Sequence, residues 1–335
     1  MKQVLAFFFA LIFFSLIINL IIGLKKSDSI ILNNFFKQNL TNKMNEPFTK
    51  YNIIFIETNK NREYFTEREL CAVESAALNN PNGEIIVYSV KAKLNQLLLN
   101  LFSNVKLYKL DFDEIIKNTV FEQWFKLNSK LLLDGPSPIE HSSDILRIVL
   151  LWKLGGYYAD LDTITLKSIE KLLLFNGFSV QSDNPLQVNN ANIIFSKEHP
   201  LLLDLMQLMT RNYDPNNWTG LGQHRIIELL RNKCSESMDK LMIYAENLES
   251  NKSKTMSCGL HLFSQKFFAP YNWFDWKILF QRNQSLEIHR FINAYAIHFY
   301  SKKSEKETYL KNSNSIFEFY AKTNCPISHM NFFNK

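Results

Sequence analysis

The chain has 335 residues, of which 46% are hydrophobic and 14% aromatic. This composition excludes a disordered protein and permits a sizeable core in one large domain or two ordinary ones. The net charge of +6 is modest for this length and no dense run of Lys and Arg occurs, so nucleic-acid binding is not indicated.

An uncharged apolar segment, residues 4–24, stands almost at the amino terminus. As a helix, about 20 residues at about 1.5 Å each span the roughly 30 Å hydrocarbon core of a bilayer. The segment therefore predicts an uncleaved transmembrane signal anchor behind a short cytoplasmic tail, residues 1–3. A cleaved signal peptide is the competing interpretation, but the apolar run is long and no small-x-small cleavage site follows it. Lys2 and the amino terminus balance Lys25 and Lys26, so charge does not fix the orientation.

Behind the anchor, the sequence changes from a polar, Asn-rich stem, residues 25–50, to an ordered domain, residues 51–335. Buried strands are expected at residues 51–58, 84–90 and 105–110. Thr66 and Glu69 form the pattern of a capping box that opens a helix between the first two strands. This alternation predicts an α/β fold with a mainly parallel sheet and helices on both faces.

Two Asp-x-Asp triplets follow these elements. Asp111 and Asp113 stand between a predicted strand and a predicted helix, so helix capping is the simpler interpretation for them. Asp160 and Asp162 end the stretch 143–162, SDILRIVLLWKLGGYYADLD. Such triplets arise often by chance, and it is the preceding helix, Gly-Gly pair and short strand that favour a functional site here.

The helix before the second triplet has one buried face. Its apolar residues recur at helical spacing: Ile145, Ile148, Val149 and Trp152. Asp144 and Arg147 are three residues apart and are therefore neighbours on the helix surface. Gly155 follows the last apolar position and can take the left-handed conformation that ends a helix. Tyr157 and Tyr158 then favour a strand.

The two aspartates after this strand predict a metal site. An extended chain would point Asp160 and Asp162 to the same side, with their α-carbons about 6–7 Å apart. One metal ion could bind one carboxylate directly, while the other reaches the metal through water or holds a ribose hydroxyl. Oxygen ligands suit a hard cation such as Mg²⁺ or Mn²⁺. Ligands in open α/β sheets gather beyond the carboxyl ends of strands. The order of a helix, a Gly-Gly pair and a short strand that ends in two aspartates can hold a divalent metal and a diphosphate against a sugar. The stretch therefore predicts a nucleotide-sugar transferase.

The later elements are less regular. A strand is expected at residues 193–195, and helices at residues 201–209 and 222–231. The aromatic cluster NWFDW, residues 272–276, is interpreted as core, with stacking on sugar rings as the alternative. Residues 293–303 form a strand-like run around His298, which as a lone histidine is interpreted as structural.

Four cysteines, Cys71, Cys234, Cys258 and Cys325, suit a lumenal enzyme. None belongs to a close Cys-x-x-Cys pair, so zinc is not indicated. Cys234 and Cys258 are close in sequence and could bridge, which would leave Cys71 with Cys325. Four cysteines allow three pairings, however, and free buried thiols are a further alternative.

Taken together, the segments resemble the alpha-1,4-glycosyltransferases of glycosyltransferase family 32, which include the lactosylceramide 4-alpha-galactosyltransferases (globotriaosylceramide synthases). The matching segments are IIFIETN, CAVESAALNNP, SDILRIVLLWKLGGYYADLD, VNNANIIF, NWFDW, AYAIHFYSKK and the final NCP. They span about residues 51–330.

The resemblance implies a GT-A fold, a Rossmann-like sheet with a metal-dependent donor site, behind the single N-terminal transmembrane helix. Asp160 and Asp162 would be the catalytic Asp-x-Asp motif that holds Mn²⁺ (or Mg²⁺) against the diphosphate of a UDP-sugar. His298 would be a third metal ligand. The residues implied in donor binding are Asp144, Arg147, Tyr158 and Asn189.

The implied activity is transfer of a sugar in alpha-1,4 linkage, with retention of configuration, from UDP-galactose or UDP-N-acetylgalactosamine to a glycosphingolipid acceptor. The implied place is the Golgi membrane, with single-pass type II topology and the catalytic domain in the lumen. Two alternatives are a catalytically inactive GT-A relative that binds glycans or protein partners, and an alpha-mannosyl- or glucosyltransferase that acts on glycoprotein glycans.

The chain departs from the family pattern in two places. After His298 the family usually has x-Trp-Asn, whereas this chain has FYS, with Tyr300 where the indole would be. Around Gly222 the family tends to have Gly-His-Gln-Gly-Pro and later Thr-Arg. Aligned without gaps, this chain has TGLGQ there, and then Ile227 and Glu228. We therefore expect a histidine, a glutamine and an arginine to be missing from a region that lines the active site.

Overall fold

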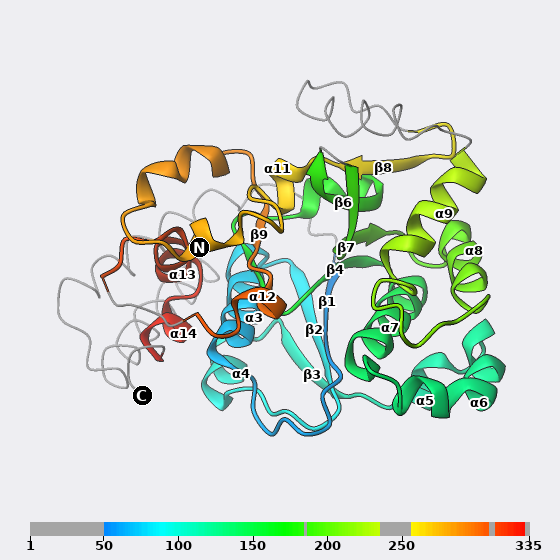
Figure 1. Cartoon of the computed structure of the whole chain (residues 1–335). Helices are drawn as coiled ribbons and strands as arrows, with labels where there is room; N and C mark the ends of the chain where they lie inside the picture. The colour runs from blue at the N-terminus through cyan, green and yellow to red at the C-terminus, as the bar shows by residue number, and fades with distance from the viewer. Residues whose placement is uncertain (1–49, 184–185, 235–255, 308–311, 332–335) are drawn as a thin grey trace, which may run out of the picture. The chain divides into compact units, whose positions relative to one another are not determined.

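A seven-stranded sheet in the order β3-β2-β1-β4-β7-β6-β8 organises the fold (Figure 1). The computed structural model describes residues 50–183, 186–234, 256–307 and 312–331. These belong to one compact unit, Lys50–Lys335. The expected tail, anchor and nearly all of the stem, residues 1–49, lie outside the described residues. Within the described ranges, no helix is both long and apolar enough to cross a bilayer.

The first four strands of the sheet lie side by side and run parallel, as the alternating sequence pattern predicts. They are β1 (Tyr51–Glu57), β2 (Gly83–Ser89), β3 (Val105–Lys109) and β4 (Gly156–Ala159). Ile53 of β1 stands opposite Ile85 on β2 and Tyr157 on β4. The capping box of Thr66 and Glu69 is present and opens α3 (Glu67–Asn79).

The remaining strands make the sheet mixed rather than wholly parallel. β7 (Leu186–Phe195) runs antiparallel to both of its neighbours, β4 and β6 (Asn176–Asp183). β8 (Leu260–Phe263) then pairs parallel to β6 at the edge. The strand expected at residues 193–195 is confirmed as the end of β7, which is longer because its earlier, more polar half also pairs.

Helices cover both faces of the sheet, as expected (Figure 1). Ile54 and Ile56 of β1 pack into the core on one face, while Ile53 and Phe55 pack into the core on the other. The helices of the first face are α5 (Phe112–Ile116), α6 (Val120–Leu133), α7 (Pro138–Leu154), α8 (Pro200–Met209) and α9 (Gln223–Cys234). Those of the second include α3, α4 (Gln96–Leu101), α11 (Gln265–Phe268) and the 3₁₀ turn η1 (Glu170–Leu174).

Asp111 confirms the capping interpretation of the first Asp-x-Asp triplet. Its side chain accepts a hydrogen bond from the backbone N–H of Glu114 at 3.2 Å, at the start of α5. Asp113 is exposed in the first turn of that helix, where a negative charge is favourable. This triplet is therefore a structural counterpart to the second one.

The Gly155–Gly156 pair turns the chain from α7 into β4. Gly155 has a φ of +66°, positive as expected, but its ψ is 170°, so the predicted left-handed helical conformation is wrong. Gly155 does end α7, and its N–H donates to the carbonyl oxygen of Leu151 at 2.8 Å, but its ψ is extended because the chain enters β4 at the next residue. Gly156 has a φ of +112°, and a Cβ at this residue would lie 2.2 Å from the carbonyl oxygen of Asn52. Only glycine lets β4 approach β1 this closely.

A second, two-stranded sheet joins β5 (Thr163–Thr165) to β9 (Ala296–His298). The strand-like run expected at residues 293–303 is therefore wrong outside β9. It ends early because Tyr300 has a φ of +54° and α12 (Ser301–Ser304) begins directly after it. The other elements of this region are η3 (Trp276–Phe280), η4 (Ser285–Phe291), α13 (Ile316–Asn324) and α14 (Pro326–Asn331).

Two disulfides and one buried carboxylate join segments that are distant in the sequence. The structure contains Cys71–Cys325, which joins α3 to the end of α13, and Cys234–Cys258, which joins the end of α9 to the segment before β8. Glu74 of α3 is fully buried and accepts hydrogen bonds from the backbone N–H groups of Ile327 and Ser328 at 2.9 and 2.8 Å, and from the Ser328 hydroxyl at 2.7 Å. It thus caps the start of α14 from a position 253 residues earlier in the chain.

We expect Glu74→Ala to lower the free energy of unfolding by about 3 kcal/mol, because it leaves three buried donors without a partner. Glu74→Gln keeps the shape and one acceptor oxygen, so its loss should be clearly smaller. Chemical denaturation of the purified protein with the disulfides intact measures both. Equal stability of wild type and Glu74→Ala would show that α14 does not depend on this carboxylate.

Candidate active site

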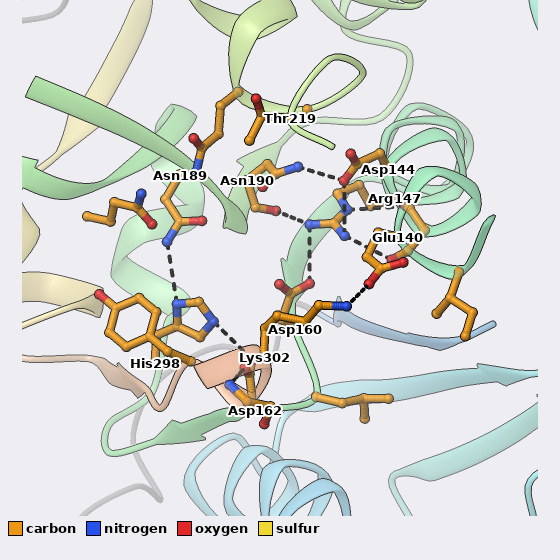
Figure 2. A pocket seen from close by; sticks show the side chains of 18 of the residues that line it. Glu140, Asp144, Arg147, Asp160, Asp162, Asn189, Asn190, Thr219, His298 and Lys302 are labelled. Carbon is orange, nitrogen blue, oxygen red and sulfur yellow. Dashed lines mark hydrogen bonds and ion pairs between the residues drawn. The ribbon is translucent and has the colours of Figure 1, made fainter. Parts of the chain in front are cut away.

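A cavity of about 1050 Å³ opens at the carboxyl end of β1 and β4. Its walls come from the amino-terminal half of α7, the turn after β4, β7, the loop before α9, and the segment after β9. Parallel strands that end at one edge of a sheet leave such a crevice, which is where α/β proteins bind ligands. All of the metal-ligand candidates lie on its wall (Figure 2).

The two aspartates of the second triplet do not lie on an extended strand. β4 ends at Ala159, and the chain turns through Leu161, with the N–H of Thr163 donating to the carbonyl oxygen of Asp160 at 3.1 Å. The expected same-side arrangement on one strand is therefore wrong, because the chain must leave the main sheet here to start β5. The turn still directs Asp160 and Asp162 into the same cavity.

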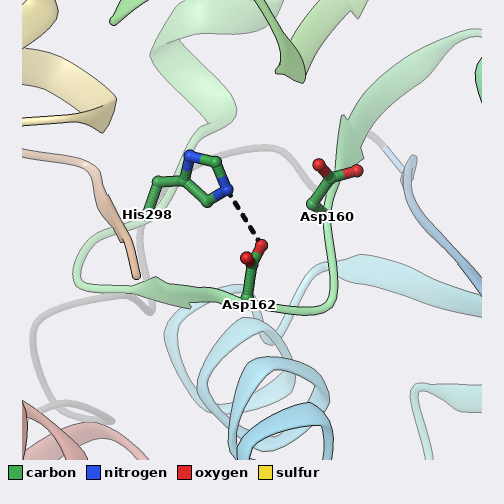
Figure 3. A group of neighbouring side chains, drawn as sticks. All are labelled: Asp160, Asp162 and His298. Atoms are coloured by element: carbon green, nitrogen blue, oxygen red, sulfur yellow. Dashed lines mark ion pairs between the residues drawn. The ribbon is translucent and has the colours of Figure 1, made fainter. Parts of the chain in front are cut away.

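His298 joins the two aspartates to form one cluster (Figure 3). Oxygen atoms of Asp160 and Asp162 and a ring nitrogen of His298 all lie within 4.8 Å of one another. The pairing of β5 with β9 sets Thr163 opposite His298, which carries the imidazole to the carboxylates across 136 residues of sequence. The interpretation of His298 as purely structural is therefore incomplete, because its ring faces the cavity beside Asp162.

The electrostatics of the cluster fit a divalent cation. Burial opposes ionisation of Asp162, but His298 and the N–H of Ser301, which donates at 2.6 Å, outweigh it and lower the pKa of Asp162 to about 2. Burial lowers and Asp162 raises the pKa of His298, and the net shift is upward. Oδ1 of Asp162 lies 3.0 Å from Nε2 of His298, is buried, and has no hydrogen bond of good geometry. Two carboxylates and an imidazole are a donor set that a divalent metal ion accepts.

Arg147 organises the carboxylates beside this cluster (Figure 2). Its Nη2 and Nη1 lie 3.2 Å from oxygen atoms of Asp144 and Asp160. Nη1 also donates to the carbonyl oxygen of Asn190 at 2.7 Å, and Nε and Nη2 donate to the carbonyl and hydroxyl oxygens of Ser143 at 3.2 and 2.9 Å. The five N–H groups of a guanidinium are thus all engaged by protein, so the geometry favours a positioning role over the expected contact with phosphate.

Asp144 is buried beside this guanidinium, and burial raises its pKa to about 6, although Arg147 lowers it. Its Oδ1 accepts from Nδ2 of Asn190 at 2.8 Å. Gly222 packs against the pair, since a Cβ there would lie 2.4 Å from Nδ2 of Asn190 and 3.0 Å from Oδ2 of Asp144. Glycine at this position therefore keeps the Asp144 carboxylate open to the cavity.

Tyr158 and Asn189, the other expected donor-binding residues, have different positions. Tyr158 is buried in β4, and its hydroxyl donates to Oδ1 of Asp160 at 2.6 Å while its ring lies 4.8 Å from the Arg147 guanidinium. It supports Asp160 from beneath rather than lining the cavity. Asn189 does line the cavity, and its Nδ2 lies 3.5 Å from Nδ1 of His298. That contact holds the imidazole on the side away from Asp162.

Two family models match the segments that build this cavity. A glycosyltransferase sugar-binding region containing the DXD motif matches residues 66–179, and an alpha 1,4-glycosyltransferase conserved region matches residues 194–332. The human lactosylceramide 4-alpha-galactosyltransferase is 28% identical over 294 residues, which cover 84% of this chain and 77% of that protein. The chain belongs to this alpha-1,4-glycosyltransferase family.

Other relatives and a solved structure also align with this chain. The mouse lactosylceramide 4-alpha-galactosyltransferase is 29% identical over 83% of this chain and 75% of its own length. The human alpha-1,4-N-acetylglucosaminyltransferase is 23% identical over 82% of this chain and 78% of its own length. Among solved structures, the PaToxG glycosyltransferase aligns with a TM-score of 0.46 at 20% identity, covering 70% of this chain and 87% of that one.

The structure shows where the residues near Gly222 that depart from the family pattern lie relative to the cavity. Gln223 and His224, at the start of α9, both line the cavity, so a glutamine and a histidine are present in this region at positions other than those of the family pattern. Ile227 lines the cavity as well. Glu228 instead pairs with Arg225, 2.7 Å away.

Several cavity residues were not assigned a role from the sequence. Lys302 of α12 reaches Glu140 of α7, with Nζ 2.6 Å from the carboxylate oxygen (Figure 2). Asn190 donates to Asp144 through its side chain and accepts from Arg147 through its carbonyl oxygen. Trp218 and Trp273 come from separate loops. Lys302, Asn190 and Trp273 lie inside segments that match the family, and that match was the available signal for them.

We expect Asp162→Asn to weaken binding of Mn²⁺ by about 10-fold or more, because one of the three candidate ligands loses its charge. Asp113→Asn, in the structural triplet, is the matched control and should bind like wild type. Isothermal titration calorimetry with MnCl₂ on each purified protein gives the affinities. Equal binding by Asp162→Asn and wild type would remove the metal site from this cluster.

Proposed function

We propose that this protein transfers galactose or N-acetylgalactosamine in alpha-1,4 linkage, with retention of configuration, from a UDP-sugar to a glycosphingolipid acceptor. The observation that carries the proposal is the Asp160, Asp162 and His298 cluster at the carboxyl end of β4, next to Asp144. The family supports a hexosyltransferase, and the names of the lactosylceramide 4-alpha-galactosyltransferases support the lipid acceptor.

We also propose the type of domain that carries the reaction and the cell compartment in which it takes place. The mixed, mainly parallel sheet with its site at strand ends supports a GT-A domain. The uncharged residues 4–24 support a Golgi anchor of type II topology. The two disulfides support a lumenal domain, because such bonds persist in oxidising compartments.

The reaction requires positive charge beside the diphosphate before the bond between the sugar and the diphosphate breaks. A hydroxyl oxygen of the acceptor forms a bond to the anomeric carbon while the bond from that carbon to the diphosphate oxygen breaks, and the hydroxyl proton passes to a phosphate oxygen of the departing UDP. Mn²⁺ or Mg²⁺ held by Asp160, Asp162 and His298 would offset the charge that develops on UDP. Asp144 makes its hydrogen bond to Asn190 through Oδ1, and its Oδ2 is placed to accept from a hydroxyl of the donor sugar. Arg147 keeps Asp144 and Asp160 in place throughout.

Lys302 is a cation on the cavity wall that could reach the diphosphate. Its side chain is 62% exposed and pairs with Glu140, whereas the guanidinium of Arg147 is buried among protein acceptors. An exposed pair of this kind contributes little free energy, so Lys302 can exchange Glu140 for phosphate at small cost. The Glu140–Lys302 pair would then open when the donor binds.

We expect Lys302→Ala to raise the KM for the UDP-sugar about 10-fold, because it removes one charge-assisted contact to phosphate. Lys306→Ala removes an exposed lysine that does not line the cavity and should leave the KM unchanged. Initial rates at varied donor concentration and saturating acceptor measure both. An unchanged donor KM in Lys302→Ala would assign the lysine a role in the fold of α12 instead.

A donor panel tests the proposed function itself. The protein is assayed with UDP-galactose, UDP-N-acetylgalactosamine, UDP-glucose and UDP-N-acetylglucosamine, each with MnCl₂ or with EDTA, against lactosylceramide and insect-type glycolipid acceptors. We expect Mn²⁺-dependent transfer from one of the first two donors, lost in Asp162→Asn. If UDP-sugars bind no better with Mn²⁺ than with EDTA, the proposal fails. Transfer from UDP-glucose or a mannosyl donor alone would favour the glycoprotein alternative.

A further inference from the structure

A continuous row of aromatic rings runs from the metal-ligand cluster to the rim of the cavity. The ring centroid of His298 lies 4.4 Å from that of Tyr300, which lies 5.6 Å from that of Trp273, which lies 6.1 Å from that of Trp218. All four side chains line the cavity. We name this row the aromatic wall.

The wall is buried at one end and exposed at the other. His298 and Tyr300 are 8% and 1% exposed, whereas Trp218 is 42% exposed, and Phe274, which follows Trp273 in the chain, is 69% exposed. A tryptophan at an open cavity leaves apolar area in water, which a packed core would not do, and such area marks a place for a ligand. The expected core role of the aromatic cluster at residues 272–276 therefore holds for Trp276, which packs on Phe280, and holds in part for Trp273, which packs against the same core but also lines the cavity. It does not hold for the exposed Phe274.

Two separate loops build the exposed end. Trp218 belongs to the loop between α8 and α9, and Trp273 to the loop after α11. Trp273 is held in place by the edge of the Tyr300 ring and by the ammonium group of Lys303, 5.1 Å from its ring centroid. The hydroxyl of Tyr300 donates to the carbonyl oxygen of Tyr271 at 2.9 Å, which fixes the inner end of the wall. The wall is thus organised before any ligand arrives.

Neutral donors and acceptors are available on the cavity wall. They include Thr219, which follows Trp218 in the chain, and Gln223 and His224 at the start of α9. Figure 2 shows Thr219 well apart from Asp162. A pyranose ring has an apolar C–H face and a rim of hydroxyl groups, which match an indole and neutral hydrogen-bonding side chains respectively. A nucleotide would place its charged phosphates beside the metal ligands, toward the ends of β1 and β4.

We propose that Trp218 and Trp273, with Phe274 beside them, form the acceptor subsite, where the apolar face of the terminal sugar of a neutral glycan stacks. The inference rests on the proposed transferase function and names the part of the cavity that function leaves unassigned. A sugar stacked on this wall would lie in the same cavity as the metal-ligand cluster, where the donor is proposed to bind.

The test uses the full chain and compares Trp218→Ala, Trp218→Phe and the control Phe319→Ala, which removes an exposed aromatic ring away from the cavity. Substrates are UDP-galactose with MnCl₂ and either methyl β-lactoside or lactosylceramide. We expect Trp218→Ala to raise the KM for both acceptors about 10-fold and to leave the donor KM and the Mn²⁺-dependent hydrolysis of UDP-galactose unchanged. Trp218→Phe should restore most of the loss, because a smaller ring still stacks.

The outcomes separate this inference from the proposed function. A higher donor KM with an unchanged acceptor KM would assign the wall to the nucleotide and overturn the inference. A rise confined to lactosylceramide would assign it to lipid and overturn it equally. If the wild type shows no transfer, quenching of tryptophan fluorescence by methyl β-lactoside still decides: quenching that Trp218→Ala abolishes supports the subsite, and its absence in wild type rejects it.

Discussion

The burial of one guanidinium among carboxylates is the interaction on which the rest of the site depends. Arg147 lies between Asp144 and Asp160, donates to oxygen atoms of Ser143 and Asn190, and lies over the Tyr158 ring. Three carboxylates so close together, counting Asp162, would repel one another in a medium less polar than water. Burial lowers the pKa of Arg147, but Asp160 and Asp144 reverse that effect, so the cation persists at any physiological pH.

This arrangement divides the cationic charge between two sources. Arg147 offsets the charges of Asp144 and Asp160, and it does so from beneath the cavity, where α7 and β4 fix it. The side facing the cavity keeps an excess of negative charge at Asp160 and Asp162, which favours a divalent cation there. The Arg147 guanidinium is thus a permanent cation of the fold, whereas a bound divalent metal ion would be exchangeable. The metal ion could act on the leaving group because the fold does not depend on it.

How much of this could be predicted depended on the range of the interactions. The strands β1 to β3, the capping box at Thr66 and the helix cap at Asp111 follow from local hydrogen bonding and periodicity, which a sequence carries within a few residues. The Asp-x-Asp triplet was recognisable only through its neighbours. The turn at Leu161 and the pairing of β5 with β9 were not predictable, because that pairing brings Thr163 to His298 from a distant part of the chain. Glu140–Lys302 and the aromatic wall join elements that are far apart in sequence, and no local pattern encodes their proximity.

Departures from the family pattern occur at both ends of the aromatic wall. Tyr300, in place of the usual tryptophan, is the second ring of the wall, and Ser301, in place of asparagine, donates its N–H to Asp162. The metal-ligand cluster is carried by the turn after β4 and by β9, and Arg147 is carried by α7, where the surrounding side chains are buried. Trp218 and Phe274 instead lie on loops and are exposed, and loops tolerate substitution because few packed neighbours depend on them. A change of ring at the proposed acceptor subsite would therefore disturb the donor side of the cavity little.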